Sequence, residues 1–414
     1  MTPITPLLQA AQQAAATVRR LSSAQKTTLL NRLADVLLSS VPDVLAQNQL
    51  DLDQVPDGDP KKDRLRLTDA RVADLAHSLR QVAVLPDPAG VVLERELEQG
   101  LRLKKLAVPL GVVGVIYESR PNVTVDVASL CLRSGNACVL KGGKEADQSN
   151  RSLVGLIQQV LTEFNVPKAA VTLLPADRAA TSELLTATRY VDILIPRGSD
   201  SLIQYVRTHS LIPTIETGAG VCHTYVEASA DLDKAARIVV NAKVSRPSVC
   251  NSLDCVLVDR AVAADFLPRL LPDFTRYDVE IFADETAFGI LQSTGYTALQ
   301  RAQPADFGRE FLDYKCAVKV VDGLGAALSH IQTYSSKHSE AIVSADPVQI
   351  DRFLSEVDAA AVYANASTRF TDGGCFGLGA EIGISTQKLH ARGPFALEKL
   401  VTEKWVIIGD GQVR

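Results

Sequence analysis

Hydrophobic residues recur at helical spacing through the first part of the chain. The pattern runs from residue 5 to about residue 84 and ends at Pro86 and Pro88. One apolar stripe in this region consists of Leu29, Leu30, Leu33, Val36 and Leu37. We therefore predict a section built entirely of helices.

A different pattern follows the prolines. Apolar and charged residues alternate from Val91 to Leu103 around a central Gln99-Gly100. Such alternation with a glycine in the middle is typical of a β-hairpin. A hairpin with one charged and one aliphatic face is either a surface flap or a contact between subunits.

From Gly111 onward, short apolar runs alternate with amphipathic stretches. The predicted strands span residues 112–117, 137–141, 171–174, 191–195 and 214–216, with helices at 148–164 and 200–208 between them. A second alternating series runs from Leu253 to about Tyr363. The βαβ order indicates parallel sheets covered by helices on both faces. The predicted fold is therefore α/β, with two parallel-sheet lobes, a cleft between them and a small hairpin.

Composition and charge exclude several classes of protein. The chain has 414 residues, of which 46% are hydrophobic, and a net charge of -5 without a basic run. This balance argues against a nucleic-acid partner. No apolar stretch is long enough for a membrane span or a signal peptide. Seven cysteines without CxxC pairs indicate reduced thiols, and hence a cytoplasmic protein.

Cys250 is the first candidate for chemistry. It lies in a predicted loop, 246–252, between a helical pattern at 231–243 and a strand-like run at 253–258. Arg246 places a positive charge nearby, which favours the nucleophilic thiolate. The alternative is a small buried hydrophobic residue, which a free cysteine usually is. The flanking residues leave the two interpretations about equally weighted.

Two glycine-containing turns are candidates for binding phosphate, although no GxGxxG motif follows any predicted strand. Gly198 and Ser199 join a strand end to a helix start, where free N–H groups bind anions. The alternative is an ordinary capped turn. Lys141, Gly142 and Lys144 follow another strand end, where α/β proteins bind ligands. Two lysines there would suit a ribose or an extra 2′-phosphate.

A third glycine-rich loop, Glu216 to Gly220, begins with an acid at a predicted strand end. Glu216 is either a general base, a cofactor contact or a turn carboxylate. His330 lies on a predicted helix with apolar neighbours, which favours packing or capping. No HExxH, HxH or Cys/His spacing indicates a metal, so we expect no metal site.

Taken together, these features resemble the aldehyde dehydrogenase superfamily and, within it, the γ-glutamyl phosphate reductases. The resemblance covers essentially the whole chain. It rests on five segments: residues 117–122, 140–146, 246–251, 330–340 and 376–394.

The resemblance implies a reaction. NADPH would reduce L-glutamyl 5-phosphate to L-glutamate 5-semialdehyde, the second step of proline biosynthesis from glutamate. Cys250 would form a thioester and expel phosphate, and the thioester would then accept hydride. The backbone N–H of Cys250 and the side chain of Asn122 would hold the oxyanion.

The resemblance also suggests roles for further residues. Glu216 would shuttle a proton or contact the nicotinamide, and Glu310 would bind the nicotinamide-side ribose. Arg120 and Arg246 would grip the substrate's phosphate and α-carboxylate, because a guanidinium binds both groups in a bidentate manner.

Domain limits and partners follow from the same resemblance. A nucleotide-binding domain would span residues 1–235, with the hairpin at about 90–108 projecting for oligomerisation. A catalytic domain would span 236–368, and 369–414 would return to the first domain and end in an oligomerisation strand. We expect a homo-oligomer in which the tail joins a neighbour's sheet, and a transient contact with the glutamate 5-kinase that supplies the acyl phosphate.

Two alternatives stay open. One is another NAD(P)-dependent aldehyde-oxidising dehydrogenase of the same superfamily. The other is a non-catalytic relative, which would have no need of Cys250, Glu216 and Lys141.

Overall fold

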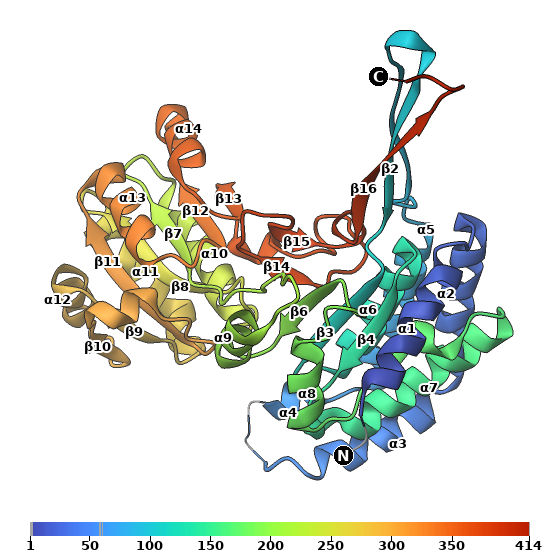
Figure 1. Ribbon diagram of the computed structural model, residues 1–414. Coiled ribbons are helices and arrows are strands. Elements are labelled where there is room, and N and C mark those ends of the chain that lie inside the picture. Colours follow the sequence, from blue (N-terminus) through green and yellow to red (C-terminus); the bar gives the residue numbers. More distant parts are fainter. Residues whose placement is uncertain (1–2, 58, 60, 414) are drawn as a thin grey trace. The chain divides into compact units, whose positions relative to one another are not determined.

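The computed structural model describes residues 3–57, 59 and 61–413, which divide into two compact units. The first unit comprises residues 1–217, 377–383 and 389–414, and the second comprises 218–376 and 384–388. The change of unit after Thr217 lies before the 235/236 limit expected from the sequence. Figure 1 shows the elements of both units along the chain.

The N-terminal section is helical, as predicted. Its helices are α1 (Thr5–Val18), α2 (Ser23–Ser39), α3 (Val41–Leu52), α4 (Lys61–Leu65) and α5 (Asp69–Val84). Ser22 and Gln25 form a reciprocal capping box at the start of α2, and the Thr68 side chain caps α5. The predicted leucine stripe of α2 is buried.

The first unit is built on a four-stranded parallel sheet of strand order β5-β4-β3-β6. The strands are β3 (Val112–Tyr117), β4 (Ala137–Lys141), β5 (Val171–Leu173) and β6 (Ile193–Arg197). The helices that alternate with them are α6 (Pro121–Ser134), α7 (Asp147–Glu163), α8 (Arg178–Leu185) and α9 (Asp200–His209). The parallel sheet predicted from the sequence is thus confirmed.

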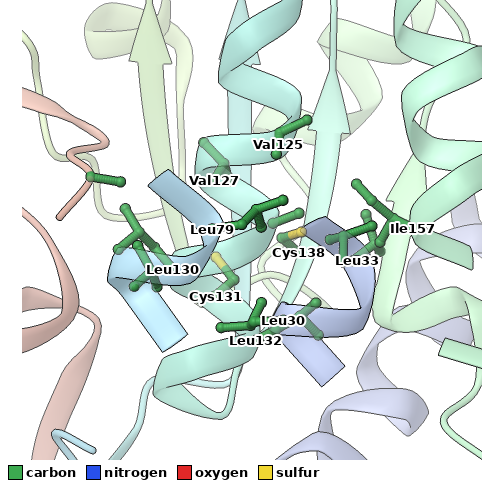
Figure 2. Packing of buried hydrophobic residues seen from close by; sticks show 14 of the residues in the cluster. Leu30, Leu33, Leu79, Val125, Val127, Leu130, Cys131, Leu132, Cys138 and Ile157 are labelled. Carbon is green, nitrogen blue, oxygen red and sulfur yellow. The ribbon is translucent and has the colours of Figure 1, made fainter. Parts of the chain in front are cut away.

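Helices cover both faces of this sheet because side chains alternate along each strand. Val113 and Val115 of β3 pack into the core formed with α2, α5, α6 and α7. Figure 2 shows this core, where Cys138 of β4 lies among leucines of the helices. Val112 and Ile116 of β3 point the other way, into a smaller core with α1, α8 and α9.

One predicted strand is wrong. Residues 214–216 form no strand, and only Thr214 makes an isolated bridge, to Leu194 of β6. Ile215 donates its N–H to the Leu194 carbonyl at 2.9 Å. The apolar pattern reflects burial against the edge of the sheet. The segment does not continue as a hydrogen-bonded strand, because glycines follow at positions 218 and 220.

The predicted hairpin is present, as β1 (Gly90–Glu96) and β2 (Arg102–Pro109), which pair antiparallel. The C-terminal strand β16 (Val401–Ile408) pairs antiparallel with the other edge of β2 in the same chain. This three-stranded sheet extends away from the helices of the first unit (Figure 1). Its exposed apolar side chains include Val91, Val92, Trp405, Ile407 and Ile408.

The second unit contains a seven-stranded parallel sheet of order β10-β9-β11-β8-β7-β12-β13. Its strands are β7 (Cys222–Val226), β8 (Leu253–Asp259), β9 (Glu280–Ala283), β10 (Leu299–Arg301), β11 (Lys315–Val321), β12 (Ser339–Val343) and β13 (Ala361–Ala364). Its helices are α10 (Leu232–Val244), α11 (Ala263–Arg276), α12 (Glu285–Ser293), α13 (Gly323–Tyr334) and α14 (Pro347–Glu356). Side chains of α10 to α12 pack on one face, and those of α13 and α14 on the other.

Near its end the chain leaves the first unit within β14 (Gly383–Ser385), and residues 384–388 belong to the second unit. It then returns to the first unit, which contains β15 (Gly393–Phe395). Among the described residues, no helix combines the length and apolar character that crossing a membrane requires.

Candidate active site

Cys250 occupies the loop that joins α10 to β8 in the second unit. The residue is half-buried and its thiol is not in a disulfide. The position agrees with the predicted loop between a helix and a strand. A thiol that is neither sealed in the core nor fully exposed can meet a substrate while the surrounding chain stays ordered.

The backbone of Cys250 is fixed from one side by the segment that precedes β7. A Cβ atom on Gly220 would lie 1.6 Å from the Cys250 carbonyl oxygen, so only glycine allows this approach. The thiol of Cys222 donates to the same carbonyl oxygen at 3.3 Å. Burial raises the pKa of Cys222 well above its usual value, so this thiol remains a neutral donor.

Asn251 fixes the loop from the other side. The side-chain amide of Asn251 donates to the Thr371 carbonyl at 2.8 Å. The backbone carbonyl of Asn251 accepts from the Thr368 hydroxyl at 2.8 Å. Asn251 is buried, so these bonds are shielded from water. The nucleophile loop, which we define as residues 246–252, is therefore ordered by contacts to two distant segments of its own unit.

Arg369 is a residue that the sequence analysis missed. Its guanidinium donates to the Asn251 side-chain carbonyl and, through Nε, to the Ser245 hydroxyl at 3.1 Å. Burial lowers the pKa of Arg369, and the positive charge of Arg246 lowers it further. Two guanidinium groups thus gather at the nucleophile loop. Arg246 itself is exposed.

Glu310, the predicted ribose contact, lies beside the same loop. Its Oε1 accepts the Gly220 N–H at 2.9 Å. Burial raises the pKa of Asp254 to about 7, and the negative charge of Glu310 adds to that shift. Lys243 is fully buried, and its Nζ lies 3.7 Å from Asp254 Oδ1.

In the first unit, Lys141 ends β4 and its side chain is buried. Its Nζ donates to the carbonyls of Gly142 and Ala176, at 3.1 and 3.3 Å. Burial lowers the pKa of this lysine. A Cβ on Gly142 would lie 2.3 Å from Asn150 Nδ2, so the turn requires glycine. Lys144 is exposed.

The turn at Gly198 and Ser199 starts α9, as predicted, and the Ser199 hydroxyl caps the helix. A carboxylate of the chain itself already binds there. Glu118 Oε2 accepts the Ser199 N–H at 2.8 Å and lies 2.5 Å from where a Gly198 Cβ would be. The free N–H that the sequence offered to a phosphate is thus satisfied internally in this structure.

Ser119, which follows Glu118 in the chain, also donates its hydrogen bonds to a carboxylate. Its backbone φ is 42°, a left-handed value that costs energy for a residue other than glycine. The N–H and the hydroxyl of Ser119 both donate to Glu145 Oε1 at 2.8 Å. Glu145 belongs to the same loop as Lys141 and Lys144, so this carboxylate links two of the predicted binding segments.

Glu216 is half-buried, and its Oε2 lies 3.8 Å from the Arg207 guanidinium. The Thr217 hydroxyl anchors the same segment by donating to the Pro196 carbonyl of β6 at 2.8 Å. The segment that carries this carboxylate is therefore anchored to β6, but Glu216 does not end a strand as the sequence predicted, because residues 214–216 form none.

Arg120 and Asn122 lie at the start of α6, where Arg120 is the N-cap residue. The Asn122 amide donates to Asp126 Oδ2 at 3.1 Å. Burial raises the pKa of Asp126 to about 7. The negative charge of Glu381 also raises this pKa, and the positive charge of Arg197 lowers it. The Arg197 guanidinium and the Glu381 carboxylate are 3.9 Å apart. The sequence analysis missed this group around Asn122.

Comparison with known proteins identifies the family of this chain. Residues 3–296 match the model of the aldehyde dehydrogenase family. The γ-glutamyl phosphate reductase of Bacteroides fragilis is 53% identical over 389 residues, which are 93% of each chain. That of Legionella pneumophila strain Paris is 51% identical over 100% of this chain and 99% of its own. The crystal structure of the Thermotoga maritima enzyme covers 100% of both chains, with 38% identity and a TM-score of 0.93.

The chain belongs to the γ-glutamyl phosphate reductases of the aldehyde dehydrogenase family. The family and the fold predicted from the sequence are both confirmed. The fold extends to distant relatives, since an acetylating aldehyde dehydrogenase from Geobacillus thermoglucosidasius has a TM-score of 0.74 at 16% identity.

Within each unit the structure gathers part of the predicted set. Cys250, Arg246 and Glu310 belong to the second unit, with Arg369 and Gly220 added. The remaining predicted residues belong to the first unit: Asn122, Arg120, Lys141, Gly142, Lys144, Gly198, Ser199 and Glu216. Gly220 lies in the glycine-rich loop that the sequence analysis named, whereas Arg369 was not predicted, because a lone arginine has no sequence pattern. Arg369 lies 118 positions after Asn251.

The first unit's loops suit a nicotinamide dinucleotide, which the chain's family binds as NAD(P). A Cβ on Gly142 would meet the Asn150 side chain and one on Gly198 the Glu118 carboxylate, so glycine lets the chain turn tightly at both strand ends, where α/β proteins bind ligands. The buried Lys141 and the capped start of α9 supply positive charge and a helix dipole.

Proposed function

We propose that this protein reduces L-glutamyl 5-phosphate to L-glutamate 5-semialdehyde with NADPH, releasing phosphate, as the second step of proline biosynthesis. The observation that carries the proposal is the half-buried Cys250 thiol on a loop held at Cys250 and Asn251 by two distant segments. Full-length identity to γ-glutamyl phosphate reductases supports the choice of substrate.

Cys250 acts as the nucleophile. Its thiolate attacks the γ-carbonyl carbon, a C–S bond forms, and the C–O bond to phosphate breaks to leave a thioester. When bound, NADPH would supply the hydride that reduces this thioester. The resulting thiohemiacetal collapses, the C–S bond breaks, and the aldehyde leaves as the thiolate is regenerated. The Cys250 N–H and the Asn122 amide hold the negative oxygen in each tetrahedral intermediate.

Arginines select the substrate's anionic groups. Arg246 and Arg369 both carry guanidinium groups at the nucleophile loop, and Arg120 is the N-cap residue of α6. A planar guanidinium binds phosphate or carboxylate through two parallel N–H bonds. We assign the phosphate and α-carboxylate of the substrate to these three residues.

Lys141, Gly142, Lys144, Gly198 and Ser199 hold the cofactor in this proposal. The two lysines provide positive charge for an adenosine 2′-phosphate, which NADPH carries and NADH lacks. A phosphate arriving at Ser199 would replace the Glu118 carboxylate on the same N–H. Glu310 contacts the nicotinamide-side ribose, and Glu216 moves a proton to or from the reacting sulfur or contacts the nicotinamide.

The proposal assigns nucleotide binding to the first unit and catalysis to the second, in place of the limits at 235/236 and 368/369 expected from the sequence. It includes a cytoplasmic location, where reduced thiols such as the seven here persist. It also includes a transient contact with the glutamate 5-kinase, because the acyl phosphate can cyclise through its own amine before it reaches Cys250.

The proposal further includes a homo-oligomer assembled through the sheet of β1, β2 and β16. Strand β16 pairs with β2 on one side, and its side chains Trp405, Ile407 and Ile408 are exposed. Pairing of the remaining edge of β16 with a neighbour's sheet would cover them. Truncation after Thr402 should give smaller particles by light scattering and a lower Tm. An unchanged particle size would rule the tail out of assembly.

The reverse reaction provides the decisive assay. Purified protein should oxidise glutamate 5-semialdehyde with NADP, and only when inorganic phosphate is present to cleave the thioester. Cys250→Ser protein is the matched control and should be inactive. Oxidation that proceeds without phosphate and yields glutamate would instead establish a hydrolytic aldehyde dehydrogenase, the principal alternative.

A further inference from the structure

Three potential metal ligands meet inside the second unit, away from the residues assigned above. They are His223 on β7, Cys255 on β8 and His330 on α13, and their ligand atoms all lie within 4.8 Å of one another. His223 and Cys255 are 0% exposed and His330 is 5% exposed. The three residues come from three elements, so no spacing along the chain marks them.

The orientation of His223 leaves one ring nitrogen directed away from its partner. Its Nδ1 lies 3.0 Å from Glu340 Oε2, and its backbone N–H donates to the same oxygen at 2.9 Å. The opposite nitrogen, Nε2, is buried and has no hydrogen-bond partner among the described residues. Because Nδ1 is taken by Glu340, Nε2 is the nitrogen that can serve the cluster.

The Cys255 sulfur lies within 4.8 Å of a ring nitrogen of each imidazole. This Sγ lies 3.7 Å from His330 Nε2, a weak contact at best. A thiol has one hydrogen, so it cannot donate to two ring nitrogens at once. A buried polar atom without a partner costs free energy, and His223 Nε2 is such an atom here.

We propose that His223, Cys255 and His330 bind one zinc-class metal ion. A metal would accept a lone pair from each of the three atoms and satisfy all of them. The thiolate and the Glu340 carboxylate carry one negative charge each, which together balance a divalent cation in this buried place. A carboxylate behind a histidine ligand, as Glu340 is behind His223, is the usual support of a zinc histidine.

The donor types favour zinc over magnesium or calcium, which prefer oxygen ligands. Zinc binds cysteine sulfur at about 2.3 Å and histidine nitrogen at about 2.0–2.1 Å in tetrahedral geometry. Ligand atoms around such an ion lie roughly 3.5 Å apart. The 3.7 Å between Cys255 Sγ and His330 Nε2 is close to that spacing, and the other pairs of ligand atoms lie within 4.8 Å, so the side chains would move closer together around an ion.

The position of the cluster suggests a structural effect on the nucleophile loop. His223 follows Cys222, whose thiol donates to the Cys250 carbonyl, and Cys255 lies on the strand that leaves the loop. An ion here would tie β7, β8 and α13 together, and β7 and β8 carry the chain to and from the segments that hold Cys250. We therefore expect metal binding to stabilise the second unit.

The test uses the full chain with Cys250→Ser and Cys375→Ser, which removes the half-buried and the exposed thiol. After chelation and desalting, Co²⁺ is titrated as an optical substitute for Zn²⁺. We expect saturation at one ion per chain, a thiolate-to-cobalt charge-transfer band in the near ultraviolet, displacement of the band by Zn²⁺, and a Tm that rises with Zn²⁺ concentration.

Cys255→Ala in that background should abolish the band. The matched control is Cys316→Ala, which removes another fully buried thiol of the same unit and should keep the band. A band that persists without Cys255, or no saturable binding in the parent chain, would overturn the proposal.

A second measurement does not depend on Cys255→Ala folding. X-ray absorption at the zinc edge of the parent chain, loaded with one equivalent of Zn²⁺, should show one sulfur and two imidazole nitrogens. A shell without sulfur, or with two sulfurs, would also contradict the site.

Discussion

Around Cys250, backbone groups and buried side chains determine the course of the chain, whereas at Ser119 and Ser199 in the other unit two carboxylates do so. The Cys250 carbonyl meets Gly220 and the Cys222 thiol. Ser199 and Ser119 instead donate to Glu118 and Glu145. A backbone contact of the first kind cannot be exchanged for a ligand, but a carboxylate can be displaced by another anion.

This difference suits the two tasks. A nucleophile must stand in one place before the substrate arrives, since misplacement of a reacting atom is costly in rate. A cofactor that comes and goes in each cycle needs groups that are satisfied in its absence. The predictions below test each side of this contrast, from the largest expected effect to the smallest.

The first prediction concerns the nucleophile itself. Cys250→Ser should lower turnover by at least about a hundredfold, because an alcohol is a far weaker nucleophile near neutral pH. Steady-state assays in either direction measure this, with an unchanged Tm showing that the fold is intact. Cys375→Ser, at an exposed cysteine, is the control and should keep full activity. More than about a tenth of wild-type turnover in Cys250→Ser would eliminate the thioester mechanism.

The second prediction concerns the support of the nucleophile loop. Gly220→Ala would place a Cβ 1.6 Å from the Cys250 carbonyl oxygen and must displace the loop. We expect turnover to fall by roughly tenfold or more and the free energy of unfolding to fall by about 1–3 kcal/mol.

Gly289→Ala provides the matched control in the same unit. Gly289 lies in α12 with nothing within 4 Å of its would-be Cβ, so alanine should be neutral or stabilise by about 0.5–1 kcal/mol. If Gly220→Ala were as active as Gly289→Ala, the loop would not be preorganised as we describe.

The third prediction concerns the cofactor loop. Lys144→Ala should raise the KM for NADPH about tenfold, with little change for NADH, because one charge-assisted bond to the 2′-phosphate is worth about 1.5–3 kcal/mol. Lys141→Ala should raise the KM for NADPH similarly but should also lower the Tm, since Lys141 is buried and bonds two carbonyls. Lys168→Ala, at an exposed lysine of the same unit, is the control. Equal effects on both nicotinamides would assign these lysines another task.

The fourth prediction concerns pH. Burial raises the pKa of Asp254 to about 7 in the folded protein, above the ordinary carboxyl value of 3.8. The folded state therefore holds a proton that the unfolded state loses first, so this contribution to stability is complete below about pH 4 and disappears as the pH rises to about 7. Asp254→Asn removes the titrating group while Lys243 keeps its two backbone acceptors.

Urea unfolding of both proteins between pH 4 and 8 measures this effect. The stability of the wild type relative to Asp254→Asn should fall by up to about 1.4 kcal/mol per pH unit across the window. Asp126, which titrates in the same range, is present in both proteins and cancels in the difference. A constant difference over the window would mean that Asp254 titrates normally.

The sequence by itself determined the elements and the principal nucleophile. Strands β3 and β4 have the limits predicted from continuous apolar runs, because a strand buried on both faces leaves that pattern. The loop position of Cys250 followed from proline and small polar residues on either side of it. Long family motifs identified the chemistry, which comparison with relatives confirmed at the level of the family.

Only the tertiary structure decided which side chains share a site. Arg369 reaches the nucleophile loop, Glu118 reaches Ser199, and Cys255 meets His223 and His330 only because distant segments are packed together. Tertiary packing also decided the conformation of residues 214–216. Their apolar pattern predicts a strand, but in the structure they form a single bridge to the sheet. Period and composition report how one segment is buried, but a hydrogen bond or a ligand set depends on distances between segments, which no local pattern records.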